Sequence, residues 1–203
     1  MNKDDLAKRD YVVMIDKSGS MTKTDCPNGK TRWEHAQEQT ENVARACAKF
    51  DDDGIDVVVF NDTPTQKTGV TPDAVEAVFA ENNPNGGTDT AKAMKMVLDG
   101  YFSRKASGIV KPLTVICVTD GEPNDENALV KTIVDASNKL DSEDEIGICF
   151  MQVGKDEHAR AFLQRLDDNL TKEGAKFDIV DTKNDEEMSN IAMEDLLLAA
   201  VND

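Results

Sequence analysis

The strongest constraint on the fold is the junction between an apolar run and a carboxylate near the amino terminus. Residues 12–15 read Val-Val-Met-Ile, and Asp16 follows directly. A run this apolar and rich in β-branched residues predicts a strand buried on both faces, which is typical of parallel sheets covered by helices. The hydroxyls of Ser18 and Ser20 come next, on either side of Gly19. The stretch therefore predicts a buried strand that presents hard oxygen atoms at its carboxyl end.

The rest of the chain alternates apolar, strand-like runs with amphipathic helical segments. Further strands are predicted at residues 55–60, 113–119, 146–153 and 177–180, with a weak edge strand near 65–68. Helices are predicted over 33–50 (stopping at 51–54), from 71 onward, over 90–102, around 129–140 and 159–170, and over 185–200. We therefore predict a single α/β domain spanning residues 1–203, with a doubly wound, mostly parallel sheet that is flanked by helices on both faces.

Charge and cysteine content restrict the class of partner and the compartment. The 40 acidic residues outnumber the 23 basic residues, and the net charge of -17 disfavours nucleic acid and anionic membranes as partners. No apolar run approaches the roughly 20 residues of a membrane span, and the first ten residues lack an apolar signal-peptide core. The four cysteines lack paired metal-binding spacing and are expected to be reduced. We therefore expect a cytoplasmic protein with neither a nucleic-acid nor a membrane partner.

A second strand end supplies the other half of a candidate metal site. The predicted strand at 113–119 also ends in a carboxylate, Asp120, and doubly wound sheets bind ligands where the strand order reverses. If the two strands are neighbours there, Asp16 and Asp120 repel one another, and a divalent cation between them removes the repulsion. Oxygen donors of this type suit Mg2+, Mn2+ or Ca2+ better than zinc. The hydroxyl of Thr88, which follows Gly86-Gly87, can reach the same edge.

These residues resemble a known family motif. Asp16-Lys17-Ser18-Gly19-Ser20 matches the D-x-S-x-S motif of von Willebrand factor A domains, Thr88 matches that family's separate metal-site threonine, and Asp120 matches its separate aspartate. The resemblance spans nearly the whole chain and implies an intact metal-ion-dependent adhesion site. In such a site the serines and the threonine contact the cation, while the aspartates often act through water. The chain looks most similar to the compact intracellular bacterial branch, such as the tellurite-resistance-associated proteins.

The resemblance implies a function as well as a site. The implied metal ligands are Asp16, Ser18, Ser20, Thr88 and Asp120, with Mg2+ as the preferred cation and Mn2+ or Ca2+ as alternatives. The expected rim for partner binding consists of Gly19, Met21, Gly87, Asp89, Gly121 and Glu122. A protein partner would offer an Asp or Glu side chain to the open coordination position. We therefore expect an adhesion-like, metal-dependent protein-binding module and not an enzyme.

Two other functions stay open, a metal-dependent phosphohydrolase and a conformational switch. Some metal-dependent phosphohydrolase sites also begin with a strand that ends in an aspartate, but they place a second aspartate two residues on, where this chain has Ser18. A serine hydrolase fits less well, because residues 17–20 do not form a G-x-S-x-G elbow. Moreover, His35 and His158 are expected on polar helix surfaces without an orienting partner.

The other open function is a conformational switch. Integrin-type relatives couple metal coordination to movement of the last helix, so residues 185–200 could form such a switch in a larger assembly.

Overall fold

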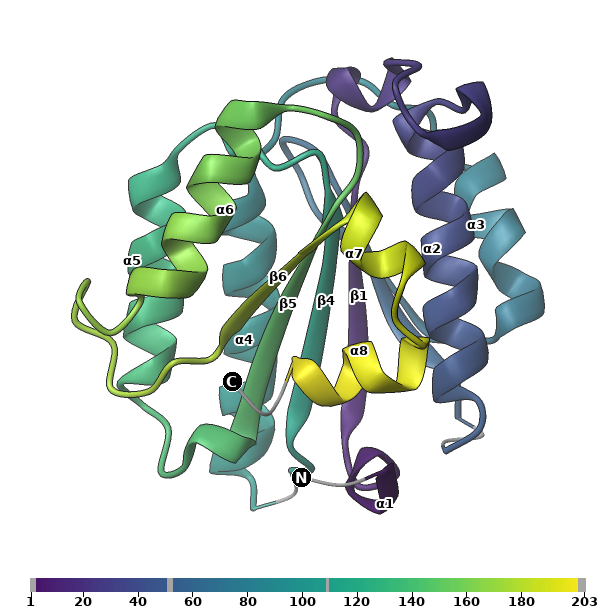
Figure 1. Cartoon of the computed structure of the whole chain (residues 1–203). Coiled ribbons are helices and arrows are strands. Elements are labelled where there is room, and N and C mark those ends of the chain that lie inside the picture. Colours follow the sequence, from purple (N-terminus) through teal and green to yellow (C-terminus); the bar gives the residue numbers. More distant parts are fainter. Residues whose placement is uncertain (1–2, 51–52, 109, 201–203) are drawn as a thin grey trace.

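In the computed structural model, which describes residues 3–50, 53–108 and 110–200, six strands form one sheet (Figure 1). The strands are β1 (Asp10–Asp16), β2 (Ile55–Phe60), β3 (Thr65–Val70), β4 (Leu113–Thr119), β5 (Ile146–Gln152) and β6 (Val180–Asn184). Their order is β3-β2-β1-β4-β5-β6, and every neighbouring pair is parallel except β2 and β3. The predicted fold class is confirmed.

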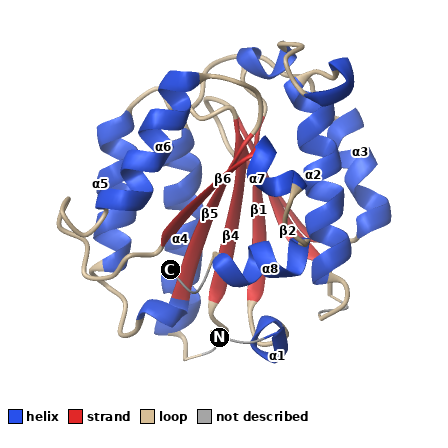
Figure 2. Cartoon of the chain, in the orientation of Figure 1, coloured by secondary structure: helices blue, strands red, loops and turns tan. Residues whose placement is uncertain are grey.

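Helices cover both faces of the sheet (Figure 2). Helices α2 (Arg32–Cys47), α3 (Val75–Ala80), α7 (Asp185–Ser189) and α8 (Met193–Ala199) pack on one face, and α4 (Thr90–Ala106), α5 (Glu126–Ser137) and α6 (Glu157–Asn169) pack on the other. The remaining helical elements are short: α1 (Lys3–Leu6) and the 3-10 turns η1 (Gly19–Thr22), η2 (Pro27–Gly29), η3 (Pro72–Ala74) and η4 (Glu143–Glu145). Among the helices of the described residues, none combines the length and the apolar composition that crossing a bilayer requires.

Strand β1 is buried on both faces, as its sequence predicts. Val13 and Ile15 pack in the cluster that contains residues of α2 and α8, whereas Val12 and Met14 pack in the cluster that contains residues of α4, α5 and α6. Burying one apolar side chain of this size contributes about 1.5–3 kcal/mol. The strand is therefore held firmly from both sides, which fixes the position of Asp16 at its carboxyl end.

The last strand differs from its prediction. The segment predicted at 177–180 is instead β6 at Val180–Asn184, a largely polar strand at the edge of the described sheet that pairs with β5. Its charged side chains are accommodated because Lys183 donates a hydrogen bond to Asp181. The prediction was wrong because an edge strand need not carry the apolar run of a central strand.

The prediction of a single last helix over 185–200 is also wrong, because two helices, α7 and α8, occupy this range. Ala192 lies between them in an extended conformation, with ψ 143°. The adjacent Leu196 and Leu197 are both fully buried, which fits a helix lying across the strands instead of running along them (Figure 1). Residues 51–52, which belong to the predicted stop of an earlier helix, lie outside the described residues.

Candidate functional site

The two carboxylates expected in the site lie at neighbouring strand ends. Strands β1 and β4 pair directly, with Ile15 opposite Val118, and the strand order reverses between them. Asp16 ends β1, and Asp120 follows the last residue of β4. Both residues are buried, with 0% and 3% of their surface exposed. They therefore lie at the switch point of the sheet, where doubly wound folds bind ligands.

Neighbouring groups hold both oxygens of Asp16. Its Oδ1 accepts a hydrogen bond from the backbone amide of Ser18 at 2.7 Å, and its Oδ2 accepts one from the hydroxyl of Thr119 at 2.8 Å. The Thr119 hydroxyl is fixed in turn, because it accepts a hydrogen bond from the amide of Gly121 at 3.0 Å. The orientation of the Asp16 carboxylate is thus set by the segments that follow β1 and β4.

The two serines of the motif lie in a tight turn directly after Asp16. Ser18 is buried and Ser20 is half-buried, and their hydroxyl oxygens are 2.9 Å apart. The turn closes because the amide of Met21 donates to the carbonyl of Ser18 at 3.1 Å. Two hydroxyls therefore sit side by side, next to the Asp16 carboxylate.

Thr88 is buried and is clamped by Asn124. The Thr88 amide donates to Asn124 Oδ1 at 3.0 Å, and the Asn124 amide donates to the Thr88 carbonyl at 2.8 Å. The preceding glycines permit this approach: Gly86 has φ +77°, and a Cβ on Gly87 would lie 2.6 Å from a carboxylate oxygen of a neighbouring loop. The Gly86 carbonyl accepts a hydrogen bond from the amide of Gly19 at 3.1 Å. The loop that carries Thr88 therefore docks on the serine turn.

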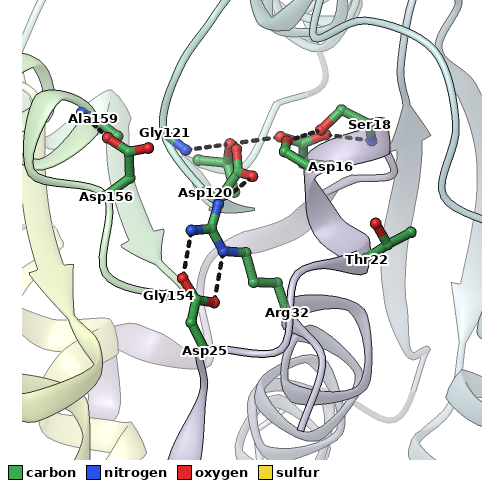
Figure 3. A network of polar contacts seen from close by, with 12 residues as sticks. Asp16, Ser18, Thr22, Asp25, Arg32, Asp120, Gly121, Gly154, Asp156 and Ala159 are labelled. Carbon is green, nitrogen blue, oxygen red and sulfur yellow. Dashed lines mark hydrogen bonds and ion pairs between the residues drawn. The ribbon is translucent and has the colours of Figure 1, made fainter.

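A buried arginine lies beside Asp120. Arg32 Nη1 donates to Asp120 Oδ2 at 2.7 Å, and 3% of each side chain is exposed. The same guanidinium donates to both oxygens of Asp25, from Nε at 2.8 Å and from Nη2 at 2.6 Å (Figure 3). Hydrogen bonds to Asp25 and then to Asp120 raise the pKa of Arg32, so its positive charge is retained.

The charge and chemistry of these groups fit a divalent cation. Burial, followed by the nearby Asp120 carboxylate, raises the pKa of Asp16 to about 6. A cation bound there would offset this penalty, and two carboxylates with three hydroxyls form a set of hard oxygen donors. Within the part of the chain that the structure describes, no three His, Cys, Asp or Glu side chains gather as a metal cluster. The hydroxyls of Ser18 and Ser20, next to Asp16, would add oxygen donors to the two carboxylates.

The residues expected on the rim have different environments. Gly19 and Glu122 are exposed, and Gly87 is half-buried. Asp89 is the N-cap of α4, where its side chain accepts a hydrogen bond from the amide of Lys92. Its carboxylate is therefore already engaged in starting a helix.

Two rim residues are corrected by the structure. Met21 is fully buried and belongs to the hydrophobic cluster on the α2 face, because η1 turns its side chain inward. Gly121 is buried as well, and a Cβ at this position would lie 2.8 Å from Ala159 Cβ. Neither residue offers surface to a partner.

The expectation for His35 was also wrong. His35 is buried, and its Nε2 lies 2.9 Å from Asp185 Oδ1, so it does have an orienting partner. The hydrogen bond to Asp185 raises the pKa of His35 despite the opposing effect of burial. Because the two residues are far apart in sequence, no local pattern predicts this pair. His158 is exposed, as expected.

Sequence reasoning missed three residues that support the site, namely Asp25, Arg32 and Asn124. Arg32 occupies the first position of α2, where a residue is ordinarily solvated, so nothing in its local sequence predicts burial. Asn124 lies in a segment of turn-forming residues, which indicates a loop but not its contact with Thr88.

Comparisons with known proteins indicate a family and a fold. A family model described as von Willebrand factor type A domain matches residues 11–122. No curated protein sequence matches the chain.

Several solved structures are similar to this one. They include an aerotolerance-related membrane protein from Bacteroides fragilis with multiple mutations to serines (16% identity, TM-score 0.63, 95% of this chain and 98% of that chain). They also include the SpRpn10 VWA domain (12% identity, TM-score 0.63, 93% of each chain). A third is the manganese-loaded TRAP protein of Plasmodium vivax (15% identity, TM-score 0.60, 95% of this chain and 74% of that chain). At these identities the likeness shows the fold alone.

Proposed function

This chain belongs to the von Willebrand factor type A domain family, and on that basis we propose that it is a divalent-metal-dependent protein-binding module. Its site would be a metal-ion-dependent adhesion site at the carboxyl ends of β1 and β4. The ligands would be Asp16, Ser18, Ser20, Thr88 and Asp120. The partner would be a protein that offers an Asp or Glu side chain.

The observation that carries this proposal is the convergence of hard oxygen donors from three separate segments. Asp16 and the two serines follow β1, and Asp120 follows the adjacent β4. Thr88 belongs to a loop that is hydrogen-bonded to the serine turn through Gly19. Asp16 and Asp120 are both buried here, and a cation bound between them would offset their mutual repulsion.

Mg2+ is the proposed cation, and the oxygen-only donor set suits a hard divalent ion. Manganese in the structurally similar TRAP protein supports a divalent cation, and Mn2+ or Ca2+ are the alternatives. When bound, the cation supplies a positive centre that accepts a carboxylate oxygen of the partner. The chain's own part is to hold its donors in place, through the hydrogen bonds of Asp16 and the clamp between Thr88 and Asn124.

The overall charge affects how such a partner arrives. A net charge of -17 gives little long-range attraction to an acidic partner. Salt limits the repulsion to a distance of about 8 Å at physiological ionic strength, so the local contact decides the affinity. We expect a slow, selective association.

The assignments of this chain to an intracellular bacterial branch and to the cytoplasm stay predictions.

The test is a pull-down from native lysate in Mg2+ and in EDTA. The bait is wild-type protein, Asp16→Ala or Ser18→Ala, with Ser107→Ala at the end of α4 as the matched control. A partner retained by wild type and Ser107→Ala in Mg2+, and lost in EDTA and from both site variants, supports the proposal. Equal capture by all four proteins in both buffers contradicts it.

We propose further that the chain is not an enzyme. Ser18 stands where a phosphohydrolase of this type has its second aspartate, and His35 is engaged by Asp185. Metal-dependent turnover of a generic phosphate ester, lost in Asp16→Ala, would contradict this proposal and favour the hydrolase alternative.

One observation favours the alternative of a conformational switch. Asp185, the first residue of α7, accepts a hydrogen bond from the amide of Gly154 through Oδ2 and interacts with His35 through Oδ1. Gly154 packs against Arg32 and thus links α7 to the site. If α7 takes part in a switch, Asp185→Asn should change partner affinity. Unchanged partner affinity in a folded Asp185→Asn variant would argue against the switch.

A further inference from the structure

Arg32 is buried to an extent that its position in the helix does not require. It is the first residue of α2, and the helix start is already capped by Thr31 and Glu34, which exchange the hydrogen bonds of a capping box. A helix can begin with almost any residue at this position, so α2 has no need of a buried arginine. Burying a guanidinium is costly unless its donors are satisfied.

The donors of Arg32 are satisfied by two carboxylates on opposite sides. Nε and Nη2 both donate to Asp25, and Nη1 donates to Asp120 (Figure 3). A planar guanidinium fixes the relative orientation of such groups, which the single ammonium of a lysine cannot do. Arg32 therefore ties Asp120 to the loop that precedes α2.

The loop after β5 is shaped around the same guanidinium. Gly154 has φ +82°, and a Cβ there would lie 2.4 Å from Arg32 Nε and 2.9 Å from its Cζ. The amide of Lys155 donates to Asp25 Oδ2 at 3.4 Å. Two loops thus enclose the arginine and leave it little freedom to move.

We propose that Arg32 is a positioning residue of the cation site, which fixes the carboxylate of Asp120 by engaging one of its oxygens. Asp25 in turn orients Arg32. This inference rests on the proposed function, and it adds two residues outside the family motif. Arg32 acts through Asp120 and does not itself contact the cation.

The direction in which Arg32→Gln changes the affinity for the cation distinguishes a positioning role of Arg32 from a simple charge effect. By Coulomb's law alone, a positive group beside the site repels a cation, so Arg32→Gln should tighten cation binding. If Arg32 positions Asp120, the same substitution should weaken cation binding, because the carboxylate loses its fixed orientation. Outer-shell partners of metal ligands typically contribute about 10–100-fold in metal affinity.

The experiment is calorimetric titration of Mn2+ into wild type, Arg32→Gln and Asp25→Asn. Arg9→Gln is the matched control. Arg9 is equally buried and donates to Thr114 Oγ1 and the Leu113 carbonyl, at the opposite end of the sheet. Its loss should destabilise the fold without touching the site. We expect Arg32→Gln to bind Mn2+ about 10–100-fold more weakly, and Arg9→Gln to bind as wild type does.

A second readout is the electron paramagnetic resonance spectrum of bound Mn2+, which reports the symmetry of its ligand shell. The spectrum of Arg32→Gln should differ from that of wild type, and the spectrum of Arg9→Gln should superimpose on it. If Arg32→Gln does not fold, Asp25→Asn provides the test, and it should bind Mn2+ more weakly than wild type does.

Unchanged or tighter Mn2+ binding by folded Arg32→Gln, with an unchanged spectrum, would overturn the positioning role while leaving the proposed function intact. Failure of wild type to bind Mn2+ would overturn the proposed function and this inference together.

Discussion

Arg32 Nη1 donates a hydrogen bond to Asp120 Oδ2 across 2.7 Å, and only 3% of either side chain is exposed. This pair joins the first residue of α2 to the carboxylate that follows β4. With Asp16 and Asp25 nearby, three carboxylates and one guanidinium share a small volume, in which Asp25 is half-buried and the other three side chains are buried. The charge balance of that volume leads to the first prediction.

Asp16→Asn should stabilise the metal-free protein. The ionised form of Asp16 is disfavoured by burial and by Asp120, and the substitution removes that charge. It also removes the hydrogen bond that Thr119 donates to Asp16 Oδ2, because an amide nitrogen cannot accept it, and this loss offsets part of the gain. We expect a gain of about 1 kcal/mol in the free energy of unfolding in EDTA. Urea denaturation in EDTA and in Mg2+ checks this, because the variant should also lose any stabilisation by Mg2+. Asp168→Asn, an equal change of charge at an exposed site on α6, should have little effect in either buffer.

Asn124→Ala should weaken cation binding without unfolding the protein. Its side chain accepts the hydrogen bond from the Thr88 amide, so the loop that carries the Thr88 hydroxyl loses its clamp. We expect Mn2+ affinity to fall by about 10-fold, measured by calorimetry. Asn138→Ala is the matched control, since its side chain donates to the Gly174 carbonyl on another surface. Equal affinities for the two variants would show that Thr88 needs no support from Asn124.

Gly154→Ala should destabilise the fold more than a substitution at another glycine with positive φ. Alanine at φ +82° is strained, and its Cβ would collide with the Arg32 guanidinium. Gly29 has φ +70°, and a Cβ added there would meet nothing within 4 Å, so Gly29→Ala isolates the backbone strain. We expect about 1–2 kcal/mol for Gly29→Ala and about 1–3 kcal/mol more for Gly154→Ala. Chemical denaturation gives both values, and identical losses would exclude the collision.

The His35–Asp185 contact should make stability depend on pH. Asp185, with a smaller effect of Glu38, raises the pKa of His35 above its ordinary value of 6.5 despite burial. The stabilisation is therefore fully present below about pH 6.5 and is lost as the pH rises through the raised folded-state pKa. Urea denaturation from pH 6 to pH 9 should show a smaller decline for His35→Gln than for wild type. His158→Gln, at an exposed histidine, should behave as wild type; a similar change in both variants would contradict the assignment to His35.

The central strands of the fold were predictable because the local sequence pattern indicates that they are buried. The strands at 55–60 and 113–119 coincide with β2 and β4, since central parallel strands carry unbroken apolar runs. Strand β6 and the break before α8 were not predictable, because a polar edge strand resembles a loop and the break depends on how α8 crosses the sheet.

The candidate site was likewise predictable only in part. Its oxygen donors follow strand ends or lie in a glycine loop, and their motif is visible in the sequence. Arg32 and Asp120 are 88 residues apart, and their contact exists only because α2 begins beside the end of β4. Met21 shows the reverse error: its place in a polar loop suggested exposure, but η1 directs it into the core.

The backbone hydrogen bond from Gly19 to Gly86, together with the clamp on Thr88, has a thermodynamic consequence. The loops that carry the oxygen donors are already packed on one another within the folded domain, so a ligand has little chain to order when it binds. Binding that orders a segment buries extensive surface and produces a large negative change in heat capacity. For this protein the enthalpy of cation binding should therefore vary little with temperature, and dehydration of the ion should dominate the cost of binding.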